Sequence, residues 1–195
     1  MSTKRLLPPF VVFLVCTAAF AQGGFDNTLR TELIEMGHRD QEVRQRASVL
    51  IRGLPEAAEE FKAAVAQQNE IDAANFQRLE ALVAEHGWPG KRLVGEEASR
   101  AALIILQHAS LKQQQQYLPV LRAAVEEGAE PGTSLAVLED GIAQAQGTKQ
   151  IYGTRVVSDS DGKPMLYPVD DPANVDARRQ AVGLPPLKEQ LRQME

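Results

Sequence analysis

The chain has 195 residues, of which 44% are hydrophobic and 5% aromatic, and its formal net charge at pH 7 is -5. A chain of this length can bury a core large enough to fold without disulfide bonds. Because phosphate contacts require a basic face, the acidic balance argues against a nucleic-acid-binding protein.

Residues 1–21 have the three parts of a secretory signal peptide. The basic pair Lys4-Arg5 precedes an apolar run from Leu6 to Phe20, which ends in the small-x-small triplet Ala19-Phe20-Ala21. The run is shorter than the roughly 20 apolar residues that a membrane-spanning helix needs. We therefore expect cleavage after Ala21, no stable membrane anchor, and a secreted or periplasmic protein.

Cleavage would leave a more acidic chain that has no cysteine. Residues 1–21 contain two basic residues, no acidic residue and the one cysteine, Cys16, so residues 22–195 carry 19 basic and 26 acidic residues, a net charge of -7. The absence of cysteine from this part excludes disulfide bonds, thiolate zinc sites and cysteine nucleophiles.

The first half of the mature chain has a helical pattern. After a flexible lead-in over 22–28, apolar residues recur at alternating spacings of four and three from Leu29 to Leu54, which is one face of a helix. Gly53 and Pro55 end this helix. Two further helices are predicted over 56–69 and 72–85, before a break at His86-Gly87-Trp88-Pro89-Gly90, where glycine and proline stop the helix.

Helices are also predicted over 96–109, 112–127 and 133–146, and the first of these is the most apolar. The pattern then changes, since 151–157 and 165–169 read as the strands of a hairpin around the turn at 159–162. A short helix to Val182 and a final amphipathic turn follow. The predicted fold class is mainly α, a multi-helix bundle with a C-terminal β-hairpin and short terminal helices, in a single helical domain over 29–195.

A few polar residues occupy positions where these helices should be apolar. Asp40 falls on the apolar stripe of the first helix, between Met36 and Val43. An unpaired buried carboxylate is costly, so Asp40 needs a partner, and Arg44 lies one turn later. An ordinary structural ion pair is the alternative interpretation.

Two of the three histidines lie at inward-facing helix ends. His108 continues the stripe of the 96–109 helix, and His86 follows Leu79 and Val83 into the break. Each alone is typical of a core histidine with one hydrogen bond, but together with Asp40 they form a candidate catalytic group. Arg44, Trp88, Gln107 and Tyr152 are the candidate ligand-binding residues.

Three kinds of chemistry would use such a group. A histidine oriented by a carboxylate moves protons near neutral pH. Two histidines and a carboxylate can hold a divalent metal with an open position for water, although nothing in the sequence requires a metal. The same residues can also hydrogen-bond a polar ligand in an apolar pocket. The metalloprotease, serine-elbow and phosphate-loop motifs are absent from the sequence.

The chain resembles a known family in a set of motifs that occur in order. It is similar to the bacterial domain of unknown function 6624 family across about Leu29 to Leu191, and Asp40-Gln41-x-x-Arg44 resembles the N-terminal pattern of that family. The motifs are His86-Gly87-Trp88-Pro89, Gln107-His108-Ala109, Tyr152-Gly153-Thr154, Val175-Asp176-x-Arg178-Arg179 and Gly183-Leu184-x-Pro186-Leu187. The family has no assigned activity.

Three positions depart from the family pattern. Ser110 stands where an acidic residue is common, Gly141 where arginine is common, and Arg155 where glutamine is common. If Ser110 or Arg155 replaces a working group, the resemblance supports ligand binding by this member but not catalysis.

We expect an exported protein that binds, or hydrolyses, a small polar ligand in a pocket lined by histidine, aspartate and arginine. In an enzyme, His108 or His86 would be the general base, and Arg44 would hold an anionic group. The alternative is a non-catalytic protein whose acidic helical surface binds an envelope partner while the polar cluster fixes the helix register.

Overall fold

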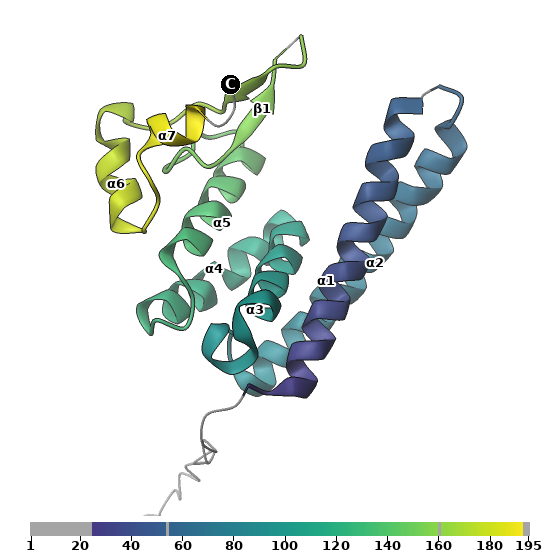
Figure 1. Cartoon of the computed structure of the whole chain (residues 1–195), viewed down its shortest axis with the longest axis horizontal. Coiled ribbons are helices and arrows are strands. Elements are labelled where there is room, and N and C mark those ends of the chain that lie inside the picture. The colour runs from purple at the N-terminus through teal and green to yellow at the C-terminus, as the bar shows by residue number, and fades with distance from the viewer. Residues whose placement is uncertain (1–24, 54, 160, 193–195) are drawn as a thin grey trace, which may run out of the picture.

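A computed structural model of the protein describes residues 25–53, 55–159 and 161–192. The predicted signal peptide and residues 22–24 of the lead-in lie outside this part. The elements in chain order are α1 (Asn27–Leu50), a 3-10 turn η1 (Ile51–Gly53), α2 (Ala58–His86), α3 (Lys91–His108), α4 (Leu111–Glu126), α5 (Gly132–Ala145), β1 (Val156–Ser158), β2 (Pro164–Leu166), a 3-10 turn η2 (Pro172–Asn174), α6 (Val175–Ala181) and α7 (Leu187–Arg192). The prediction of a mainly α fold with a C-terminal hairpin is confirmed (Figure 1).

Helix α1 buries the predicted stripe from Leu29 to Ala47, but it ends at the half-buried Leu50, whereas the stripe was predicted to continue to Leu54. Asp26 caps the helix, because its carboxylate accepts the backbone N–H of Leu29 at 3.0 Å. The helix therefore begins at Asn27, two residues before the predicted boundary. The buried residues are Leu29, Leu33, Met36, Gly37, Asp40, Val43 and Ala47.

Helix α2 is one continuous helix of 29 residues, whereas two helices with a break at residues 70–71 were predicted. No glycine or proline lies between Ala58 and His86, so nothing in this segment stops the helix. The apolar stripe runs through the expected break and places Asp72 on the same face as Phe76 and Leu79.

Helix α3 runs parallel to α1 and ends beside its middle. The backbone N–H of Asp26 donates to the carbonyl of Leu93 at 2.8 Å, which holds the starts of the two helices together. Farther along, a Cβ atom on Gly37 would lie 2.9 Å from the Cβ of Ala101, so glycine permits this close approach. Beyond the end of α3, residues 45–50 of α1 and 58–71 of α2 continue as a two-helix hairpin, and we call this part the arm (Figure 1).

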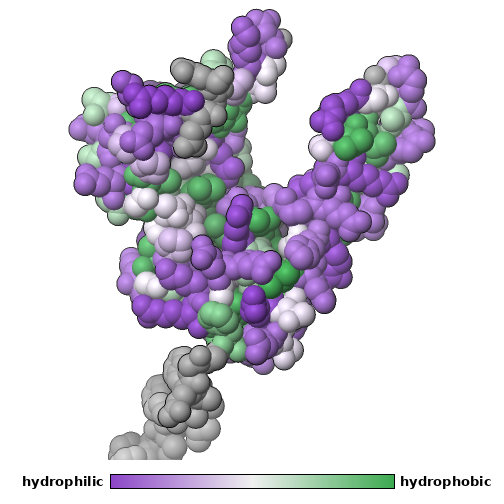
Figure 2. Space-filling view, viewed as in Figure 1, coloured by the Kyte–Doolittle hydropathy of each residue, from purple (hydrophilic) through white to green (hydrophobic). Residues whose placement is uncertain are grey.

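The other helices complete the core on the opposite side of α3. Helices α4 and α5 pack against each other, and α5 leads into the β-hairpin, α6 and α7 (Figure 1). Figure 2 shows the molecule hollowed between the arm and this C-terminal part. None of the helices in the described residues is both long enough and apolar enough to span a bilayer.

The hairpin is shorter than predicted. Its register pairs Val157 with Met165, and each strand has three residues. Residues 151–154, which were predicted as part of the first strand, instead form a loop, because several of their backbone N–H groups bind the buried carboxylate of Asp140.

Candidate functional site

A cluster of polar side chains lies where α1, α2 and the end of α3 meet. At its centre is Asp40, which is 1% exposed. Its Oδ1 accepts from Nδ1 of His108 at 2.8 Å and from Nε of Arg44 at 3.2 Å, and its Oδ2 accepts from Nε2 of Gln41 at 2.8 Å. The position of Asp40 on the apolar stripe predicted that it is buried and paired, and the structure confirms both.

Helix α2 adds a second carboxylate to the cluster. Arg44 Nη2 donates to Oδ1 of Asp72 at 2.5 Å, so one guanidinium holds carboxylates from two helices. Asp72 was not among the predicted site residues, because the expected break in α2 placed it at the start of a helix, where a carboxylate is ordinary. The signal was present, since Asp72 lies four and seven residues before Phe76 and Leu79 on the apolar stripe.

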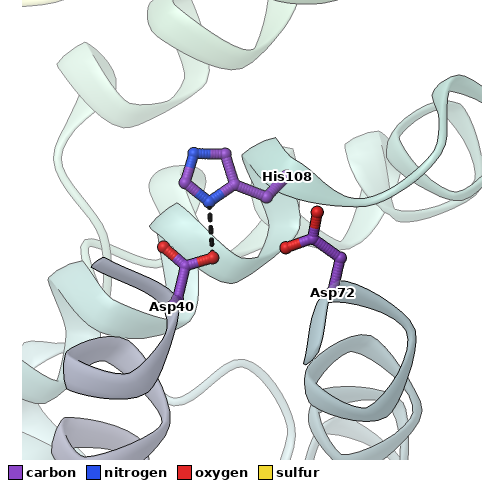
Figure 3. Close-up of side chains that lie close together, drawn as sticks. All are labelled: Asp40, Asp72 and His108. Atoms are coloured by element: carbon purple, nitrogen blue, oxygen red, sulfur yellow. Dashed lines mark hydrogen bonds and ion pairs between the residues drawn. The ribbon is translucent and has the colours of Figure 1, made fainter. Parts of the chain in front are cut away.

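His108 brings its ring to Asp40 from the last turn of α3 (Figure 3). Its Nε2 lies on the side of the ring away from Asp40, has no hydrogen-bond partner among the described residues and is not buried. The side chain is 26% exposed, against 1% for that of Asp40. One ring nitrogen is therefore held by a buried carboxylate, and the other is open to solvent.

The two carboxylates differ in pKa, although they share Arg44. Burial works to raise the pKa of Asp40, but the hydrogen bond and charge of His108, together with Arg44 and Gln41, outweigh it and lower the pKa. Burial raises the pKa of Asp72, because Arg44 offsets it only in part. Asp40 is therefore ionised at neutral pH, and His108 must donate through a protonated Nδ1.

The same side chains have the composition of a metal site. Among the residues that the structure describes, Asp40, Asp72 and His108 each offer a ligand atom within 4.8 Å of the others (Figure 3). Two carboxylates and an imidazole suit a divalent cation. Arg44, however, already supplies a positive charge to both carboxylates, so a metal would have to displace it from Asp72.

The second predicted histidine is not part of this cluster. His86 ends α2, fourteen residues after Asp72, which at 1.5 Å per residue is about 21 Å along the helix. It is exposed, and its Nε2 lies 3.5 Å from Glu85. The expectation that His86 and His108 meet around one pocket is therefore wrong, since the continuous α2 carries His86 away from the cluster in which His108 lies.

Trp88 also lies apart from the cluster and anchors the loop after α2. Its indole N–H donates to Oε2 of Glu130 at 3.1 Å. Glu130 is 5% exposed and accepts from the hydroxyl groups of Ser99 at 2.6 Å and Ser134 at 2.8 Å. This network joins the loop to α3 and α5, and its contacts are those of a structural element.

Gln107 and Tyr152 make their contacts outside the polar cluster. The backbone carbonyl of Gln107 accepts from the side chain of Gln114, and its side chain points to a different face of α3 from that of His108, because consecutive helical residues are about 100° apart. Tyr152 lies in the loop that binds Asp140, and burial together with Glu139 raises the pKa of its phenol to about 12.

Comparison with known proteins identifies the chain at family level. The sequence model of a family of unknown function, DUF6624, matches residues 27–195. The chain belongs to this family. No curated protein matches it, and no solved structure does.

The C-terminal motifs of this DUF6624 chain form a structural network. Asp140, which is fully buried, accepts from the backbone N–H groups of Ile151, Tyr152 and Thr154 at 2.6, 3.0 and 2.9 Å. On the other side of the loop, the buried Arg179 donates to the carbonyls of Tyr152 at 2.7 Å and Pro185 at 2.6 Å. The Tyr-Gly-Thr and Arg-Arg motifs of the family thus hold one loop between α5 and α6.

Two of the departures from the family pattern lie side by side. A Cβ atom on Gly141 would overlap the guanidinium of Arg155, which packs on α5 and donates to the carbonyl of Val137 at 3.1 Å. Arg155 therefore occupies the space beside position 141. The third departure, Ser110, caps α4 together with Gln113, so it has a structural role of its own.

This packing gives a prediction for Gly141. Alanine is favoured over glycine inside a helix by about 1 kcal/mol, yet we expect Gly141→Ala to destabilise the protein, because its methyl group would displace the half-buried guanidinium of Arg155 from the carbonyl of Val137. In an Arg155→Gln background the same substitution should stabilise it. Urea unfolding of the two single variants and the double variant measures the difference, and equal effects of Gly141→Ala in both backgrounds would exclude the clash.

Proposed function

We propose that Asp40 and His108 form an acid–base pair that acts on a small polar ligand bound beside the end of α3. The observation that carries the proposal is the 2.8 Å contact between Nδ1 of His108 and a carboxylate that is 1% exposed, while Nε2 remains open to solvent. This arrangement fixes the tautomer and leaves a basic nitrogen facing the ligand.

The residues suit a hydrolytic reaction. Nε2 of His108 would remove a proton from water, the resulting hydroxide would attack an acyl or phosphoryl centre, and the imidazolium would return the proton to the leaving group. Asp40 would stabilise the imidazolium, as the carboxylate does in other carboxylate–histidine pairs. Arg44 Nη1 has no partner among the described residues and is not buried, so it is available to an anionic group of the ligand.

Two measurements on His108 test this proposal. At a pH where the ring is neutral, ¹⁵N NMR should show a protonated Nδ1 and a bare Nε2 on His108, unlike on the exposed His38 and His86. We also expect His108→Gln to slow the hydrolysis of 4-nitrophenyl acetate or bis(4-nitrophenyl) phosphate by about 100-fold. His86→Ala is the matched control and should leave the rate unchanged. A bare Nδ1, or equal rates for the wild type and His108→Gln on both esters, would contradict the proposal.

A metal-dependent hydrolase is the second candidate, and the 4.8 Å grouping of Asp40, Asp72 and His108 favours it. A bound divalent cation would activate water in place of the imidazole. The same NMR spectra separate the two candidates, because Zn²⁺ bound at this cluster would require Nδ1 of His108 to lose its proton. The metal would be favoured if one equivalent of Zn²⁺ removed the Nδ1 proton signal in a saturable way. Asp72→Asn is the control and should keep that signal.

The predicted signal peptide leads to a proposal about location. Residues 1–21 have the basic, apolar and small-residue segments of a cleavable leader, so we propose that the protein acts after export. N-terminal sequencing of the protein purified from its native source should begin at Gln22.

A further inference from the structure

A groove runs along the contact between α1 and α3 and ends next to the polar cluster. We call it the α1–α3 groove, and its volume of about 320 Å³ suits a small molecule. Its lining residues are Ile34, Gly37, His38 and Gln41 from α1 and Glu97, Arg100, Ala101 and Ile104 from α3. The lining is mixed in character, because four of the eight residues are aliphatic or glycine and the other four carry polar or charged groups.

The groove leads to the proposed acid–base pair on both of its walls. On α1, Gln41 lines the groove and donates to Oδ2 of Asp40 at 2.8 Å. On α3, Ile104 lies one turn before His108, about 6 Å along the helix. A ligand lying in the groove therefore has one end beside His108.

Charge complementarity suggests what lies at the other end. Arg100 is exposed and forms no ion pair with any of the residues that the structure describes. Glu97, the one carboxylate of the lining, is already 3.8 Å from Arg30. An anionic group would be attracted to Arg100, which lies about 12 Å before His108 on α3.

We propose that the α1–α3 groove binds an anionic amphipathic ligand, with its carboxylate at Arg100 and its apolar body leading to His108. The inference rests on the proposed function for the identity of the reacting end, but binding in the groove does not require catalysis. It narrows the substrate class to compounds in which an apolar segment separates an anionic group from a hydrolysable one.

Octanoate is the probe that tests the inference, because it carries the carboxylate and the apolar segment without a hydrolysable bond. In a titration followed by methyl NMR of the protein, we expect millimolar binding with shifts at Ile34 and Ile104. Butyrate, which has the charge without the chain, and octanol, which has the chain without the charge, should each bind at least fivefold more weakly.

Variants locate the binding site. Ile104→Trp should fill the groove and abolish the shift at Ile34, whereas Ile71→Trp, on the groove between α1 and α2, is the matched control and should leave binding intact. Arg100→Gln should weaken octanoate binding roughly fivefold to tenfold, and Arg100→Lys should weaken it less.

The outcomes separate this inference from the proposed function. His108→Gln should bind octanoate as the wild type does, so binding that survives in this variant supports the groove even if the variant retains full hydrolytic activity. The groove proposal is overturned if octanoate does not bind, or if Ile104→Trp leaves binding unchanged. It is also overturned if the shifts occur at Leu103, which lines a separate cavity of about 480 Å³ that also borders Arg100.

Discussion

Asp40→Asn is expected to lower the free energy of unfolding at pH 7 by about 3 kcal/mol, because it removes a buried carboxylate that three donors share. Asparagine keeps one acceptor oxygen but carries no charge, so Arg44 and His108 lose the counterion between them. Urea unfolding followed by circular dichroism measures the change. The ¹⁵N spectrum of His108 should also lose its preference for a protonated Nδ1.

The pH dependence of this effect has a definite sign. The pKa of Asp40 is lowered in the folded protein, so its carboxylate contributes stability at neutral pH and above its ordinary pKa. That contribution is lost as the pH falls through the lowered pKa. The difference in the free energy of unfolding between the wild type and Asp40→Asn should therefore be largest at neutral pH and decrease in acid.

Asp72→Asn is the matched control, because the pKa of Asp72 is shifted the other way. Burial raises it, so the ionised Asp72 costs stability at neutral pH, and this cost disappears as the carboxyl group is protonated. We expect Asp72→Asn to destabilise the protein less than Asp40→Asn does at pH 7. Equal stability of Asp40→Asn and the wild type at pH 7 would show that the cluster contributes nothing to folding.

The core of this cluster could be predicted from local spacing. Asp40 interrupts the apolar stripe of α1, Arg44 lies one turn after it, and His108 continues the apolar stripe of α3. The apolar stripe of a helix is the face that becomes buried when the helix packs. The sequence therefore indicated that Asp40 and His108 face inward. It did not indicate which helices pack together, because parallel packing of α1 and α3 depends on the close approach of Gly37 to Ala101.

The errors at His86 and Asp72 have a single cause. The two predicted helices are one continuous helix, α2, in the structure, since residues 70 and 71 are Glu and Ile and neither stops a helix. A rigid helix of this length carries Asp72 into the cluster and His86 about 21 Å away from it. Because of this one wrong boundary, the predicted site contained the imidazole of His86 instead of the carboxylate of Asp72.

The first strand of the hairpin is shorter than predicted for a different reason. Residues 151–154 have residue types typical of a strand, but α5 presents a buried carboxylate to their backbone N–H groups. A charged acceptor binds these donors more strongly than the carbonyls of a partner strand would. Strand propensity is a local property, whereas Asp140 reaches the loop across 11 to 14 positions of the chain.

Asp140→Ala is expected to release this loop from α5. Asp140 is fully buried and accepts three backbone N–H groups, and it also accepts the hydroxyl of Thr154 at 2.9 Å. Alanine would leave four donors without an acceptor, so we expect a loss of about 4 kcal/mol in the free energy of unfolding. Hydrogen exchange should show the amides of Ile151, Tyr152 and Thr154 losing protection.

Two controls make the Asp140 result interpretable. Asp140→Asn retains one acceptor oxygen and should lose about half as much stability, while Asp170→Ala changes an exposed aspartate in the same region and should have an effect below about 0.5 kcal/mol. Because the loop contacts α5 and α6 and the cluster lies between α1, α2 and α3, the NMR signals of His108 should be unchanged in Asp140→Asn. A change in the tautomer of His108 in that variant would mean that the loop and the acid–base pair are coupled through the core. The Tyr-Gly-Thr motif would then belong to the proposed site as well as to the fold.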